Sequence, residues 1–182
     1  KLHGPKGIGF LYVDEKVKLF PLMLGGGHQN GLRSGTLNTP GIAGLGLAAK
    51  LSYSHLKEKQ ELLYHLKDFF IEELEKIDGV SVHSERGEAS APHIVSAAFK
   101  GVKAEVLLHA LEERGIYVSS GSACSSNHPG ISGTLKAIGL SHEELDSTLR
   151  FSFSQYTEKR DLEECISVLK EELPVLRKFF KA

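Results

Sequence analysis

Apolar residues recur at helical spacing along a long stretch in the first half of the chain, and this pattern constrains the fold more than any other feature. The positions that carry it are Leu56, Leu63, Leu66, Phe70, Leu74 and Ile77. Such spacing is typical of an amphipathic helix that buries one stripe against other elements. The helical region begins at Asn38-Thr39-Pro40, with Thr39 as the predicted cap and Pro40 in the first turn. So long a pattern predicts one break near residues 52–54 and an end at Asp78-Gly79.

The second half alternates short strand-like runs with helices, which predicts an α+β arrangement. Strands are predicted at residues 80–83, 92–99, 116–118 and 148–153, and an earlier buried strand at residues 8–13. Helices are predicted at residues 104–114 and 134–138, with a capping box at residues 141–144. Thr157 is predicted to cap a final helix, whose apolar stripe comprises Leu162, Cys165, Ile166, Leu169, Leu173 and Leu176.

Composition and charge exclude several classes of partner. The 182 residues carry a formal net charge of -1, whereas a nucleic-acid groove needs a surplus of Lys and Arg. No apolar run approaches the roughly 20 residues that span a bilayer. We therefore expect neither nucleic acid nor membrane among the partners. The chain opens at Lys1 without a methionine and runs at once into an apolar stretch, which predicts a fragment or a processed chain.

The two cysteines differ in their surroundings. They are too few and too far apart for a disulfide scaffold, and they predict a reducing, cytoplasmic location. Cys165 lies on the apolar stripe of the last helix and is predicted to be a core residue. Cys124 lies among small residues, from Ser119 to Ser126, in a stretch predicted to stay open to water. Cys124 is therefore either a reactive thiol or a surface cysteine without a task. Cys124 with His128 offers too few ligands for a metal, so no metal site is predicted.

Other polar residues can also carry chemistry. Lys1 and Lys6 flank a turn, where a desolvated lysine can form a Schiff base, although most lysines are solvated charges. Arg150 lies in an alternating strand and needs an anionic partner, either a substrate carboxylate or a structural Asp or Glu. The loop from Gly25 to Thr36 supplies flexible backbone and hydroxyls that suit a phosphate.

Four segments together resemble the cysteine desulfurases, the NifS-like group of the class-V aminotransferase family. They are Lys1-Leu-His-Gly-Pro-Lys-Gly-Ile-Gly-Phe10, Gly25-Gly-Gly-His-Gln-Asn-Gly-Leu-Arg-Ser-Gly-Thr36, Ser119-Ser-Gly-Ser-Ala-Cys124 and Leu149-Arg-Phe-Ser152. Their order and spacing match the family across essentially the whole chain. The segment that ends at Cys124 is the most specific of the four.

The resemblance implies roles for individual residues. Lys1 matches the lysine that binds pyridoxal phosphate (PLP) as a Schiff base, whereas Lys6 does not bind the cofactor. Thr36 matches a threonine that reaches the PLP phosphate of the neighbouring subunit, which implies a homodimer. Arg150 matches the arginine that binds the substrate carboxylate, and Cys124 matches the nucleophile that becomes a persulfide. The histidine and aspartate that hold the PLP ring in this family belong to an earlier half, which has no counterpart here.

The resemblance also implies the fold, which is α/β and of the PLP-dependent transferase (aspartate aminotransferase-like) type. Residues 1–57 are expected to be the C-terminal remainder of the PLP-binding large domain. Residues 58–182 are expected to be the α+β small domain, which carries the cysteine loop at residues 119–130.

The implied activity is that of a PLP-dependent cysteine desulfurase, which converts L-cysteine to L-alanine and leaves a persulfide on the enzyme. A sulfur-acceptor protein such as an iron–sulfur scaffold is the implied partner, and the isolated fragment is expected to be inactive. Two alternatives remain open. The chain can belong to a selenocysteine lyase or another class-V aminotransferase-like enzyme, or it can be an inactive truncated half that serves as an interaction module.

Overall fold

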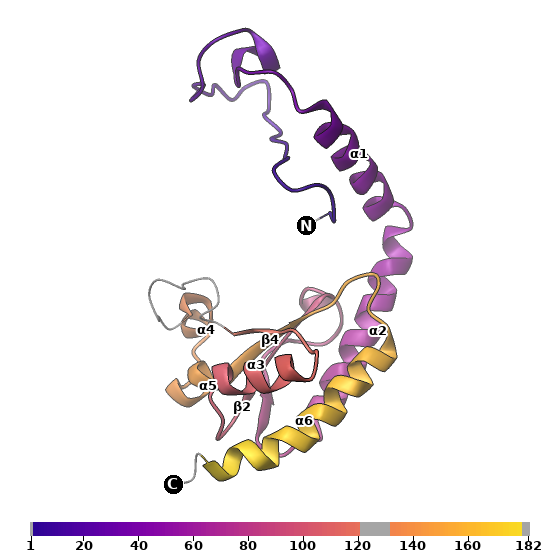
Figure 1. The fold of residues 1–182 in the computed structure, drawn as a ribbon, viewed down its shortest axis with the longest axis vertical. Helices are drawn as coiled ribbons and strands as arrows, with labels where there is room; N and C mark the ends of the chain where they lie inside the picture. Colours follow the sequence, from indigo (N-terminus) through magenta and orange to yellow (C-terminus); the bar gives the residue numbers. More distant parts are fainter. Residues whose placement is uncertain (1, 121–131, 180–182) are drawn as a thin grey trace. The chain divides into compact units, whose positions relative to one another are not determined.

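The computed structural model describes residues 2–120 and 132–179, and the chain divides into two compact units, Lys1–Leu56 and Lys57–Ala182. Figure 1 shows the course of the chain through both units. Each unit is described by itself below. The predicted Lys1 and Cys124 sites lie outside the described residues.

Helix α1, Thr39–Tyr53, is the main element of the first unit. Asn38 caps it, because its side-chain oxygen accepts a hydrogen bond from the Gly41 amide at 3.1 Å. The cap therefore lies one residue before the predicted Thr39. A Cβ on Gly44 would lie 2.7 Å from the Pro5 ring, so a glycine at this position lets the Gly4-Pro5 turn pack directly on the helix.

The strand predicted at residues 8–13 is wrong. No strand forms there, and Phe10, Leu11 and Tyr12 are exposed. A strand needs a neighbour for its backbone hydrogen bonds. Between residues 2 and 56 the only ladder contact is a single bridge between Met23 and Arg33. The apolar character of this segment is real, but the described part of the unit offers it no partner.

The predicted break in the long helical region is confirmed. Helix α1 ends at Tyr53, His55 adopts a left-handed backbone with φ of 55°, and α2 runs over Leu56–Glu75. The predicted stripe is also confirmed, since α2 buries Leu66, Phe70, Ile71 and Leu74. Gly79 supports the turn that follows with φ of 68°, a conformation that favours glycine.

The second unit is built on a four-stranded antiparallel sheet. Its strands are β1 (Val80–Val82), β2 (Ile94–Phe99), β3 (Ser119–Ser120) and β4 (Thr148–Ser152), arranged in the order β1-β2-β4-β3. Three strands overlap the predicted ranges. The strand predicted at residues 116–118 is displaced, because Ile116 and Val118 pack on the core just before the backbone pairs at Ser119.

Helices α2, α3 (Ala104–Glu113) and α6 (Lys159–Phe179) bury apolar side chains in one core with the sheet. Figure 1 labels these helices and strands β2 and β4. Phe70 of α2 meets Phe151 and Phe153 edge to face, with ring centroids 5.0 and 5.6 Å apart. Leu149 and Phe151 of β4 point into this core, so Arg150, which lies between them, points to the other face of the sheet.

The second unit also contains three shorter elements: 3-10 turn η2 (Gly87–Ala89), α4 (Gly133–Ala137) and α5 (His142–Ser147). The first unit contains 3-10 turn η1 (His28–Gly31). The capping box predicted at the start of α5 is confirmed, since Ser141 and Glu144 each bind the other's backbone amide. The Ser141 hydroxyl also donates to the Glu144 carboxylate at 2.7 Å, and this bond, with the one from the Ser141 amide, holds the pKa of Glu144 below its usual value. Thr157 does not cap α6 and instead accepts a hydrogen bond from the Ser154 amide.

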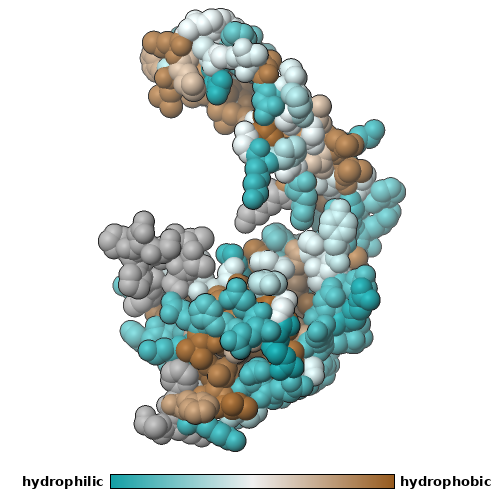
Figure 2. Space-filling view, in the orientation of Figure 1, coloured by the Kyte–Doolittle hydropathy of each residue, from teal (hydrophilic) through white to brown (hydrophobic). Residues whose placement is uncertain are grey.

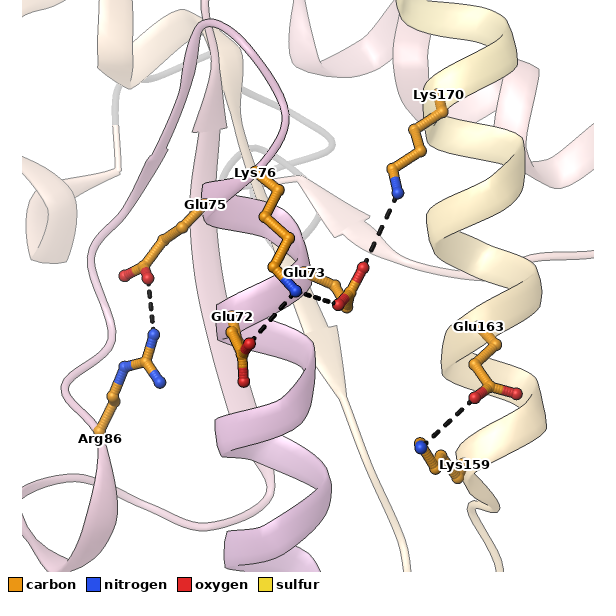
Figure 3. A network of polar contacts seen from close by, with 8 residues as sticks. All are labelled: Glu72, Glu73, Glu75, Lys76, Arg86, Lys159, Glu163 and Lys170. Carbon is orange, nitrogen blue, oxygen red and sulfur yellow. Dashed lines mark hydrogen bonds and ion pairs between the residues drawn. The ribbon is translucent and has the colours of Figure 1, made fainter.

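One ion pair joins α2 and α6 on the surface of the second unit, within a larger network of charged side chains (Figure 3). Glu73 of α2 lies between Lys76, in the turn just after its helix, at 2.6 Å, and Lys170 of α6, at 3.7 Å. Arg86 pairs with Glu75 at 2.6 Å. All of these groups are solvent-exposed to some degree, so they add little to the stability of the fold.

Candidate functional site

Arg150 lies in the middle of β4, on the face of the sheet opposite the core, and is exposed. Within residues 2–120 and 132–179, no Asp or Glu forms an ion pair with it. The sequence left open whether Arg150 meets a structural acid or a substrate carboxylate. The described part of the chain provides no structural acid, which leaves this guanidinium available for an external anion.

Both neighbouring strands place a serine beside Arg150. Ser96 of β2 and Ser119 of β3 lie directly opposite it in the strand registers. Directly opposite residues of antiparallel strands point to the same face. The face that bears Arg150 is called the open face below. Neither serine was predicted as a site residue, because strand pairing cannot be read from a single sequence.

His83 directly follows β1 and lies beside Ser96 of β2. Its amide donates to the Ser96 carbonyl at 2.8 Å, and its ring reaches to 3.5 Å from the Thr148 hydroxyl. Burial lowers the pKa of His83, and the negative charge of Glu144 opposes this shift. The neutral imidazole is thus favoured, and it adds no cation next to Arg150.

The loop from Gly25 to Thr36 in the first unit is closed at its base. The Ser34 hydroxyl donates to the Gly26 carbonyl at 2.7 Å, and the Arg33 guanidinium donates to the Ser34 carbonyl at 2.9 Å. A Cβ on Gly35 would lie 2.9 Å from that guanidinium, and Gly35 has φ of 110°, so glycine is required there. Thr36 follows with an exposed side chain. An exposed hydroxyl three residues after a cationic side chain suits a phosphate group.

Cys165 is confirmed as a core residue. It is buried in α6, and burial, with a smaller contribution from Glu164, raises the pKa of its thiol to about 12. A thiol in this state is a poor nucleophile because the thiolate is the reactive form. Cys165 is therefore not suited to nucleophilic chemistry.

The described residues offer few alternatives to this set of groups. In residues 2–120 and 132–179, no three His, Cys, Asp or Glu side chains are arranged to hold a metal ion. Among the described helices, none combines the length and the apolar character that crossing a bilayer requires.

A model of the class-V aminotransferase family matches residues 1–165 of the chain. The chain belongs to the class-V aminotransferase family. The resemblance drawn from four sequence segments is thereby confirmed.

Curated relatives of this class-V aminotransferase chain are cysteine desulfurases. The cysteine desulfurase IscS of Dictyoglomus turgidum is 38% identical over 178 residues, which cover 97% of this chain and 45% of the relative. The cysteine desulfurase of Nostoc sp. is also 38% identical, over 97% of this chain and 44% of the relative. The chain thus spans less than half the length of these relatives.

Solved structures agree with this family. A NifS-like protein matches with a TM-score of 0.84 at 29% identity, over 96% of this chain and 44% of that protein. SspA in complex with cysteine matches with a TM-score of 0.59 at 32% identity, over 86% of this chain and 42% of SspA. The predicted α/β fold class is confirmed by these matches.

Proposed function

We propose that this chain is the C-terminal part of a PLP-dependent cysteine desulfurase in which Cys124 accepts sulfur from L-cysteine. The observation that carries the proposal is the register of β3 on β4, which sets Ser119 opposite Arg150. Ser119 opens the segment that contains Cys124 five residues later. Even a fully extended chain keeps Cys124 within roughly 17 Å of that strand. The arginine proposed to bind the carboxylate therefore lies on β4, next to β3, the strand that precedes the thiol segment.

The first unit would contribute the cofactor contacts. Pyridoxal phosphate, when bound, supplies an electron sink beside the α-carbon of the substrate. Lys1 would hold the cofactor and move the proton at the substrate α-carbon. The exposed hydroxyl of Thr36 would donate a hydrogen bond to the PLP phosphate of the neighbouring subunit, which implies a homodimer. Residues 1–57 would accordingly be the end of the large domain, and residues 58–182 the small domain.

The second unit would carry the sulfur transfer. Arg150 binds the substrate carboxylate through two parallel hydrogen bonds. Cys124, as a thiolate, attacks the substrate sulfur, so that a sulfur–sulfur bond forms while the bond between the β-carbon and sulfur breaks. The electron pair of the broken bond stays with the β-carbon, which takes up a proton. The products are L-alanine and a Cys124 persulfide, and no external oxidant or reductant is needed.

The persulfide would then pass its outer sulfur to an acceptor protein, such as an iron–sulfur scaffold. Small side chains throughout residues 119–126 suit a segment that carries the thiol from the substrate to the acceptor. The chain has only two cysteines, and Cys165 is free, which supports a cytoplasmic location. The isolated chain would be inactive, because the ring contacts of the cofactor come from the earlier half of the enzyme.

The test is L-alanine formation from L-cysteine by the full-length enzyme. Cys124→Ala should abolish L-alanine formation, whereas Cys165→Ala, the matched control, should retain it. Undiminished activity of Cys124→Ala would refute the role of this thiol. Release of selenide from L-selenocysteine by Cys124→Ala, without any activity of the wild type on L-cysteine, would favour a selenocysteine lyase instead.

A further inference from the structure

Three polar residues form a row across the open face of the sheet, and the mechanism above uses only the middle one. The row runs from Ser96 through Arg150 to Ser119, on three adjacent strands. Cβ atoms of directly opposite residues are typically about 5 Å apart. A long cationic side chain thus has a short hydroxyl side chain on each side.

The residues around this row determine which part of the open face an external group can reach. On the β1 side, the imidazole of His83 is engaged with Thr148 rather than with the row. Thr148 and its partner Ala98 are buried, and α5 contacts β2 at this end of the sheet. Further along β4, Arg150 and Ser152 are exposed. The part of the open face that an external group can reach therefore centres on Arg150 and its two serines.

The two hydroxyls have no other task in the described parts of the chain. Ser96 uses its backbone amide and carbonyl, with the Ser84 hydroxyl at 2.9 Å and the His83 amide at 2.8 Å. Within residues 2–120 and 132–179, no hydrogen bond engages the Ser96 or Ser119 hydroxyl, and both side chains are half-buried. A half-buried hydroxyl gains from a partner, and here the ligand can be that partner.

We propose that the hydroxyls of Ser96 and Ser119 complete a carboxylate site around Arg150, each donating to one oxygen of the substrate carboxylate. A carboxylate accepts about four hydrogen bonds, and the guanidinium fork supplies two. The serines supply donors for the sites that remain. The ligand class is the α-carboxylate of an amino acid, so this inference rests on the proposed function and assigns two further residues to it.

The experiment separates the carboxylate from the rest of the substrate. 3-Mercaptopropionate keeps the thiol and carboxylate of L-cysteine, whereas cysteamine keeps the thiol and amine. Calorimetric titration of the full-length holoenzyme measures the Kd of each, without turnover. Ser96→Ala and Ser119→Ala should each raise the Kd of 3-mercaptopropionate about tenfold and leave the Kd of cysteamine unchanged. The reason is that 3-mercaptopropionate carries the carboxylate that the hydroxyls bind, whereas cysteamine does not. In turnover, KM for L-cysteine should rise while kcat stays near the wild-type value.

Two controls make the result specific. Ser81→Ala removes a hydroxyl from the same face in β1, with β2 between it and β4, and should bind both probes like the wild type. Ser96→Thr and Ser119→Thr keep the hydroxyl in a strand and should restore binding. Wild-type affinity for 3-mercaptopropionate in both alanine variants would overturn the inference. A wild type that binds this probe but does not convert L-cysteine would refute the proposed function alone.

Discussion

Lys67 is fully buried in α2. Its amine donates a hydrogen bond to the Ser90 hydroxyl, which in turn donates to the Glu85 carbonyl at 2.7 Å. Burial lowers the pKa of Lys67 below 10.5, although the charges of Asp68 and Glu85 oppose the shift. The fold therefore disfavours the charged amine more than the unfolded chain does.

This burial makes stability depend on pH. Between the lowered pKa of folded Lys67 and its unfolded value, the unfolded chain binds more protons, so the free energy of unfolding should rise with pH in that window. Below the window, the cost of the buried charge is fully present. Lys67→Met should lose this rise, whereas the exposed control Lys136→Met should retain it. Urea unfolding from pH 7 to pH 10 measures the effect, and equal slopes for Lys67→Met and the wild type would contradict it.

Single residues were predictable where a local pattern decides their environment. Cys165 follows from its position on a helical stripe. The burial of Lys67 could not be predicted, because it is a charged residue between apolar positions of the stripe. Only the packing of η2 against α2 reveals that burial. Arg150 was identified by its strand, but the serines beside it depend on pairings between segments distant in the sequence.

Among the contacts between elements, the packing of α2 on the sheet is central to the core of the second unit. Phe70 has no exposed surface and touches two aromatic rings of the β4 region. Removing such a ring loses buried apolar area and leaves a cavity that the neighbouring rings fill only in part.

Phe70→Ala should therefore lower the free energy of unfolding of the second unit by about 3–5 kcal/mol. Phe179→Ala, at an exposed position near the end of α6, should change it by less than about 0.5 kcal/mol. Urea titration followed by circular dichroism compares the two. A loss below about 1 kcal/mol for Phe70→Ala would show that this contact does not hold α2 on the sheet.

Elements were predicted well where the signal is local. The break at His55, the capping box at Ser141 and the stripe of α2 each depend on neighbours within a turn or two of the helix. The strand at residues 8–13 failed because a strand requires a partner, and apolar character alone does not supply one. Strand β3 was misplaced because its pairing with β4 sets its position.

At the scale of the whole molecule, the first unit exposes an unusual amount of apolar surface. Its exposed large apolar residues before the loop are Phe10, Leu11, Tyr12, Val17, Leu19, Phe20, Leu22, Met23 and Leu24. Figure 2 shows brown surface at the part of this unit that Figure 1 draws as loops before α1. Soluble monomers rarely leave a large apolar patch uncovered. The relatives are more than twice as long as this chain.

The 182-residue chain alone should accordingly bind an apolar fluorescent dye through this segment. Phe20 and Leu22 are 93% and 97% exposed, so Phe20→Ser with Leu22→Ser should lower the dye signal without affecting the fold. Tyr117→Ser, which removes an exposed ring from the second unit, is the control. An unchanged dye signal in the double variant would show that the dye binds to another apolar surface.

The central claim is that sulfur from L-cysteine becomes bound to the thiol at position 124. It is tested most directly by peptide mass spectrometry of the full-length enzyme after incubation with L-cysteine and trapping with an alkylating reagent. One additional sulfur atom should be found on the peptide that contains Cys124, should disappear on reduction, and should be absent from the Cys165 peptide. L-Alanine formation with no added sulfur on Cys124 would contradict the account.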